Sequence, residues 1–400
     1  MKLKILAIGI ISLMLCSAMA YVVSTPNLDK KDENIVSQTK DSHVNNNAKD
    51  ANQEISYSKI HGFDAFYSYD DLTNLLAQLQ QEYPKIFCYS SLGKTWEGRD
   101  IWLVKISDNV TKDENESKVL YKGGEHGDEK QGYQVVIYSI NSFVENYTYV
   151  KVNESFTKRV RNVVNNTELF FIPMVNPDGC EAGTRENARP NDCLFGKTLF
   201  KGVDLNRNTG YKWELIDEYP WKYRHHFPYI EKTNVKYAQF DWASIRGESS
   251  YRGPYPFSEP ETRAIKQVVE NHSIKISIDY HGASPRGEIL YGWGWTNDPR
   301  PDDCVSYPIA ENISKMAGCK IGRVSGVAPI LGLIGDWEYA EHGTMSFGME
   351  LPKTTGIKPL LNLIHQNGYL ISSKNTPILQ ICKTYFPVDI YLAEKAMSMS

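Results

Sequence analysis

The sequence lacks the distinguishing features of several protein classes. After the first twenty of its 400 residues, no apolar run is long enough to span a bilayer as a helix. None of its seven cysteines belongs to a C-x-x-C pair, so a thiolate zinc site is not expected. A formal net charge of −4 gives no reason to expect binding to nucleic acid or to an anionic membrane surface. With 41% hydrophobic and 23% charged residues, the composition is that of an ordinary globular protein.

The N-terminus has the pattern of a secretory signal. Two lysines precede the apolar run ILAIGIISLMLCSAMA, which ends in a small-x-small cleavage sequence. Residues 1–20 are therefore predicted to send the chain to a secreted or cell-surface location, with membrane attachment only if this leader is kept as an anchor. Residues 21–54 are polar and rich in Asn, Asp and Lys, which predicts a spacer or a short pro-segment.

Two further features fit an extracytoplasmic location. Six cysteines follow the leader, and an even number predicts up to three disulfides, with Cys180–Cys193 and Cys304–Cys319 as the nearest local pairings. Seven N-x-S/T sequons allow N-glycosylation. They begin at Asn109, Asn115, Asn146, Asn153, Asn165, Asn271 and Asn312.

From His61 onward the pattern predicts alternating helices and strands. Apolar spacing predicts helices over 72–83, which Pro84 ends, and over 261–272. The strand candidates are 100–107, 118–123, 168–174, 275–282, 288–294 and 344–351. This order predicts an α/β fold whose mixed, mostly parallel central sheet has helices on both faces. In such sheets the binding crevice lies beyond the carboxyl ends of the strands.

Polar residues stand where the predicted strands end. His126 and Glu129 follow one strand, His281 closes another, and Glu350 lies near the end of a third. Two histidines and one glutamate, with a fourth position left to water, are a known catalytic zinc set. Another carboxylate, Glu350, is then placed to act as general base on that water. A single H-x-x-E or a single strand-end histidine is weak evidence, so the hypothesis depends on the whole set.

The other histidines are interpreted as structural or solvent-facing. The His225-His226 pair lies in an aromatic, loop-like stretch with no strand before it. The remaining five are His43, His61, His272, His342 and His365.

From about Tyr57 to the 350s the sequence resembles the zinc metallocarboxypeptidases of the carboxypeptidase A type. The matching motifs stand in that family's order: EGR (97–99), GGEHGDE (123–129), NPDG (176–179), GVDLNRN (202–208), YRGPYPFSEPET (251–262), GDWEYA (335–340) and FGMEL (347–351). The resemblance implies that residues 55–400 form a catalytic domain with a C-terminal extension. It also implies a monomeric enzyme that removes amino acids from the C-termini of peptides or proteins.

The resemblance implies one Zn²⁺ per chain. His126, Glu129 and His281 would bind the ion, and Glu350 would be the general base and proton shuttle.

Other matching residues would handle the substrate. Arg185, in RENARP, would polarise the scissile carbonyl and stabilise the oxyanion, with Arg189 as the alternative. Asn206 and Arg207 would hold the C-terminal carboxylate, a task suited to the planar arginine fork. Asp178 matches a recurring motif of the family and is interpreted as structural.

Two positions depart from the family pattern. Ala328-Pro329 stands where the family usually has a Tyr-Pro that caps the substrate, so a tyrosine from the insertion 211–239 is a candidate substitute. Gly335, just before Asp336, is neither the apolar residue of A-type enzymes nor the acidic residue of B-type enzymes. A broad or apolar preference for the C-terminal residue is therefore expected.

Three other functions compete with the peptidase. A related zinc amidohydrolase that deacylates N-acyl amino acids uses a similar H-x-x-E…H set, and a cell-wall peptidase of this fold differs only in substrate. The secretory pattern, EGR and SEPET motifs favour the peptidase over the deacylase. A catalytically dead binding module would have lost Glu350 or a metal ligand, and none is lost here.

Overall fold

A computed structural model describes most of the chain from residue 62 to residue 399. The stretches outside the described residues are 1–61, 64, 150–153, 191–201, 217–249, 327–329, 353, 355–377 and 400. The described residues all belong to one unit, Tyr57–Ser400. The predicted leader and spacer, the His225-His226 pair and the Ala328-Pro329 departure lie outside the described residues. Among the helices of the described part, none is both long and apolar enough to cross a bilayer.

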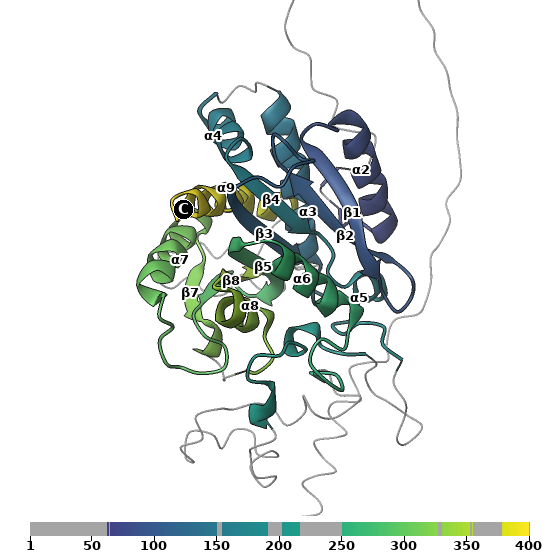
Figure 1. Ribbon diagram of the computed structural model, residues 1–400, viewed down its shortest axis with the longest axis vertical. Helices are drawn as coiled ribbons and strands as arrows, with labels where there is room; N and C mark the ends of the chain where they lie inside the picture. Colours follow the sequence, from purple (N-terminus) through teal and green to yellow (C-terminus); the bar gives the residue numbers. More distant parts are fainter. Residues whose placement is uncertain are drawn as a thin grey trace, which may run out of the picture. The chain divides into compact units, whose positions relative to one another are not determined.

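An eight-stranded sheet runs through the centre of the unit in the order β1-β2-β4-β3-β5-β8-β6-β7 (Figure 1). The strands are β1 Phe87–Lys94, β2 Asp100–Ile106, β3 Ser117–Gly123, β4 Thr167–Ile172, β5 Ile274–Ser284, β6 Glu288–Tyr291, β7 Lys320–Arg323 and β8 Met345–Pro352. The four central strands β4, β3, β5 and β8 are parallel, whereas β1 pairs antiparallel with β2, β2 with β4, and β6 with β8. The predicted α/β class with a mixed sheet is confirmed.

Helices cover both faces of the sheet. They are α2 Tyr69–Glu82, α3 Lys130–Thr148, α4 Glu154–Val164, α5 Pro177–Ala182, α6 Pro260–Asn271, α7 Asp303–Ala317, α8 Ile334–His342 and α9 Ile378–Met397. Helices α2, α3, α4, α7 and α9 share one apolar core with the sheet, and α6 and α8 share the second core. Because both faces are covered, the central strands β3 and β4 are buried at every position, as parallel strands usually are.

Helix α2 shows how local sequence sets an element. Ser68 accepts a hydrogen bond from the Asp71 amide while the Asp71 carboxylate accepts one from Ser68, a capping box worth about 1 kcal/mol. The buried leucines at 72, 75, 76 and 79 repeat at helical spacing and face the core. The helix ends at Glu82 because Tyr83, which precedes Pro84, is disfavoured in the helical region.

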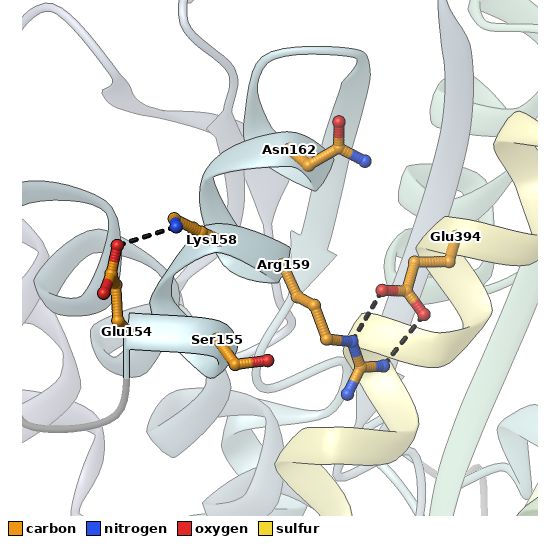
Figure 2. A pocket seen from close by; sticks show the side chains of 6 residues that line it. All are labelled: Glu154, Ser155, Lys158, Arg159, Asn162 and Glu394. Atoms are coloured by element: carbon orange, nitrogen blue, oxygen red, sulfur yellow. Dashed lines mark hydrogen bonds and ion pairs between the residues drawn. The ribbon is translucent and has the colours of Figure 1, made fainter.

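The last helix, α9, is fixed to the body at its middle and near its end. In the middle, buried Asp389 accepts hydrogen bonds from Ser139 of α3 and Tyr280 of β5. Near the end, Figure 2 shows Arg159 of α4 forming a two-pronged ion pair with Glu394, at 2.7 and 2.8 Å. Helix α9, the described part of the C-terminal extension, is therefore part of the larger apolar core.

The predicted Cys304–Cys319 disulfide is wrong. Cys304 and Cys319 are free thiols: Cys304 lies in the first turn of α7 and Cys319 just past its last turn, so most of a helix roughly 22 Å long separates them. A disulfide needs Cα atoms within about 7 Å. Cys180 is also a free thiol, packed against the Gly124 carbonyl, and its predicted partner Cys193 lies outside the described residues. Cys88 and Cys382 are free as well.

The buried carboxyl of Asp389 should make the free energy of unfolding depend on pH. Burial raises its pKa to about 7, although the Ser139 and Tyr280 hydroxyls oppose the shift. The folded chain thus holds this proton more tightly than the unfolded chain, whose aspartate titrates near pH 3.9. Stability is therefore lost as the pH rises from about 4 to about 7, by a few kcal/mol at most. Asp389→Asn removes this titration, so thermal unfolding should show a larger gain over wild type at pH 8 than at pH 5.

Glu394→Gln is the matched control, because Glu394 is a partly exposed carboxylate of the same helix. Its pair with Arg159 is worth at most about 1 kcal/mol. The control should change stability equally at both pH values. An Asp389→Asn effect that is the same at pH 5 and pH 8 would contradict the buried-proton explanation.

Candidate active site

Three neighbouring parallel strands deliver the predicted metal and base residues to one edge of the sheet. His126 follows β3, and Glu129 is the residue that begins α3. His281 lies in β5 directly opposite Glu350 of β8. The carboxyl ends of parallel strands meet at the same edge, so residues far apart in sequence come together.

The donor atoms of the two histidines and Glu129 face one another. His126 Nδ1 lies 3.0 Å from one oxygen of Glu129, and His281 Nδ1 lies 3.1 Å from the other. A tetrahedral zinc ion with bonds of about 2.0 to 2.1 Å needs donors roughly 3.3 Å apart, so the set fits the ion. The three residues come from the turn after β3, the start of α3 and the end of β5.

The turn that carries His126 packs directly on the backbone of α5. A Cβ at Gly127 would stand 2.0 Å from the Gly179 carbonyl carbon, so only glycine allows this approach. Asn176 caps α5 by accepting from the Gly179 amide and also reaches the Glu125 carbonyl. Residues 176–179, the NPDG motif, thus pack against the turn that carries His126 and help to set its conformation.

Asp204 is a site residue that the sequence reasoning did not identify. It is fully buried, its Oδ1 lies 3.2 Å from His126 Nε2, and its Oδ2 accepts from Arg185. Burial alone would raise the pKa of Asp204, but Arg185, Arg207 and His126 hold it well below its usual range. A carboxylate on the second nitrogen of a metal-binding histidine fixes the ring and raises its basicity. The sequence feature that could have identified Asp204 is its place in GVDLNRN, two positions before Asn206.

The structure separates the two candidate arginines. Arg185 Nη1 lies 3.1 Å from His126 Nδ1 and 3.4 Å from Glu129, beside the metal set. Arg189 instead pairs with Glu259 and stacks over Trp96.

Asn206 and Arg207 line the same cavity beside the metal set. Asn206 Nδ2 is 3.2 Å from His281 Nε2, and its Oδ1 accepts from the Ile334 amide. Arg207 donates to the Asn206 carbonyl, and burial lowers the pKa of its guanidinium. The Asn206 carbonyl is the guanidinium's one hydrogen-bond partner among the described residues, so the guanidinium has donors left to bind a carboxylate in the cavity.

Glu350 borders this cavity, which has a volume of about 240 Å³ and is also lined by both histidines, Arg185 and Arg207. Burial raises the pKa of the Glu350 carboxyl, with Glu129 adding to the shift while His281 and His126 oppose it. A carboxyl with a raised pKa both accepts and returns a proton more readily near neutral pH.

The residues expected to be structural lie apart from this cavity. Asp178 accepts hydrogen bonds from Thr95, Arg99 and the Glu97 amide, and so holds the EGR turn. His272 stacks on Phe170, and His342 lies edge-on to Trp337.

Residues 72–378, more than half of the chain, match the family model described as zinc carboxypeptidase. A zinc carboxypeptidase from Saccharothrix mutabilis subsp. capreolus is 26% identical over 74% of this chain and 64% of its own length. Carboxypeptidase A1 of Rattus norvegicus is 26% identical over 76% of this chain and 65% of its own length. The catalytic chain of human carboxypeptidase N is also 26% identical, and the match spans only 52% of its length.

The solved carboxypeptidase A from Helicoverpa armigera has the same fold, with a TM-score of 0.62 and 20% identity over 85% of this chain and 75% of that structure. The match over residues 72–378 shows that the chain belongs to the zinc carboxypeptidase family.

Proposed function

We propose that the protein is a zinc-dependent carboxypeptidase that releases amino acids one at a time from the C-termini of peptides or proteins. One observation carries the proposal: the His126–Glu129–His281 donor set, the partly buried Glu350 carboxyl and the Arg207 guanidinium line the same cavity. A metal set with a nearby acid–base group suits hydrolysis, and a carboxylate-binding arginine beside it suits an exopeptidase.

The three donors hold one Zn²⁺ per chain in this proposal. The bound ion supplies a water of lowered pKa and polarises the scissile carbonyl. Glu350 takes the proton of the attacking water and returns it to the leaving amine. Arg185, held rigidly by Asp204, donates to the developing oxyanion without having to reorganise.

The terminal carboxylate of the substrate is bound by Arg207, with Asn206 beside it. Placing a carboxylate there positions the last peptide bond over the metal set, and an internal peptide segment lacks the charge that would compensate the arginine. Exopeptidase specificity therefore depends on the Arg207 cation that lines the cavity.

The enzyme is proposed to act as a monomer outside the cytoplasm, either secreted or at the cell surface. The charged start, apolar run and small-x-small end of residues 1–20 support export. The sequons allow glycosylation at that location. Retention of the leader as an anchor would place the enzyme at the membrane surface.

Glu350→Gln should lower kcat for a C-terminally free peptide by about 10² to 10⁴ because the variant has no group to move the proton. Zinc content measured after dialysis should stay at that of wild type, since Glu350 is not one of the three donors. Glu288→Gln is the control. Glu288 of β6 is the cross-strand neighbour of Glu350 on β8, but it is not among the residues that line the cavity. Near-normal turnover in Glu350→Gln would show that another group is the base.

Metal removal and substrate amidation test the two halves of the proposal. Blocked dipeptides should release their last residue, and a chelator should abolish release until Zn²⁺ is added back. The same dipeptides with an amidated C-terminus should not be cleaved, because Arg207 then has no anion to bind. Hydrolysis of an acyl-aspartate without cleavage of any dipeptide would instead identify a deacylase.

A further inference from the structure

Two residues before His281 on β5 and before Glu350 on β8, the sheet has a second row of cross-strand neighbours. Its members, in sheet order, are Lys122 of β3, Asp279 of β5, Gly348 of β8 and Leu290 of β6. Side chains two residues apart on a strand point to the same face, so Asp279 lies beneath His281 on the cavity side. All four residues of this second row line the cavity that the metal set borders.

The two oxygens of Asp279 have different surroundings. Oδ2 lies 3.9 Å from His281 Nε2. Oδ1 is buried and has no amide or cationic donor in the described part of the chain, where the hydrogen-bond neighbour of the Asp279 carboxylate is the Glu125 carboxyl. A buried carboxylate oxygen without such a donor is costly, and a cationic ligand in the cavity would supply one.

In the described part of the chain Lys122 attracts Asp279 but forms no ion pair with it. Its ammonium group bonds to Glu338 of α8, whose second oxygen accepts from Ser277. The positive charge of Lys122 is therefore offset by the negative charge of Glu338. Asp279 has no lysine or arginine bonded to it in the described part of the chain. Glu125 lies beside Asp279 and His281 and adds a second carboxyl to this acidic group.

The rest of the cavity suits a long side chain that ends in a charge. Leu290, Leu333 and Phe347 offer apolar walls for an aliphatic stem. Gly348 adds no side chain between Asp279 and Leu290. At Gly335 a Cβ would stand 2.7 Å from Ser346 Oγ, so glycine keeps the cavity open at that side.

We propose that Asp279 is a specificity-determining residue and that the pocket selects peptides ending in lysine or arginine. This inference rests on the proposed function, since it names the residue that the carboxypeptidase would remove. The terminal carboxylate binds Arg207 while the cationic end of the side chain pairs with Asp279 below the metal set. The acidic group thus comes from β5 and not from position 335, which departs from the broad or apolar preference expected from Gly335.

The experiment compares kcat/KM for five blocked dipeptides that end in Lys, Arg, Leu, Phe or Glu. It uses the zinc-loaded full chain in wild type, Asp279→Asn and Asp279→Ser, with zinc content measured for each. Wild type should prefer Lys and Arg over Leu and Phe by at least about tenfold. In both variants that ratio should fall to about one or below, with Leu and Phe still released.

Three results would overturn the inference. The first is a wild-type preference for Leu, Phe or Glu, which decides the matter even if both variants fail to fold. The second is a preference for Lys and Arg that persists in the variants. The third is an equal loss on all five substrates together with loss of zinc, which would mean that Asp279 acts only through His281. Release of none of the five residues by zinc-loaded wild type would instead refute the carboxypeptidase itself, and this inference with it.

Discussion

The parallel pairing of β3, β5 and β8 is the constraint on which the rest of the site depends. It sets His281 opposite Glu350 and places the turn after β3 at the same edge. A one-residue slip of β5 would turn His281 to the other face, so the metal set and the base exist only in this register. The register is held by the apolar cores on both faces of the sheet, which no single substitution in the cavity removes.

Placing this many charges inside a sheet is costly unless each has a partner. Asp204 has two arginines and a histidine around it, Lys122 has Glu338, and Glu168 has Lys105 and Lys118. The buried charges are therefore mostly cancelled in local groups that hold their members in place. Asp279 differs because its strand neighbour Lys122 is already engaged.

The sequence predicted the site best where residues stand in fixed relation to strand ends. His126, His281 and Glu350 follow from that rule, and the structure brings them together. Asp204 could not be predicted from that rule, because it lies 78 positions from His126 in the sequence and its contact with His126 depends on the path of a loop. Lys122 and Asp279 were visible as charged residues in apolar strands, but their partners depend on strand register. The Cys304–Cys319 expectation failed because closeness in sequence says little when most of a helix, α7, separates two cysteines.

The hydrogen bond between Tyr280 and Asp389 joins the strand that carries His281 to the last helix of the chain. Tyr280 and Tyr385 of α9 also meet edge to face, within the larger apolar core. A ribosome makes the metal ligands well before it makes α9, and domains complete their packing only when all their parts have emerged. Strand β5, which carries His281, therefore gains its contacts with α9 last. A nascent chain without α9 contains all three metal ligands but lacks the helix that helps to hold His281 in position.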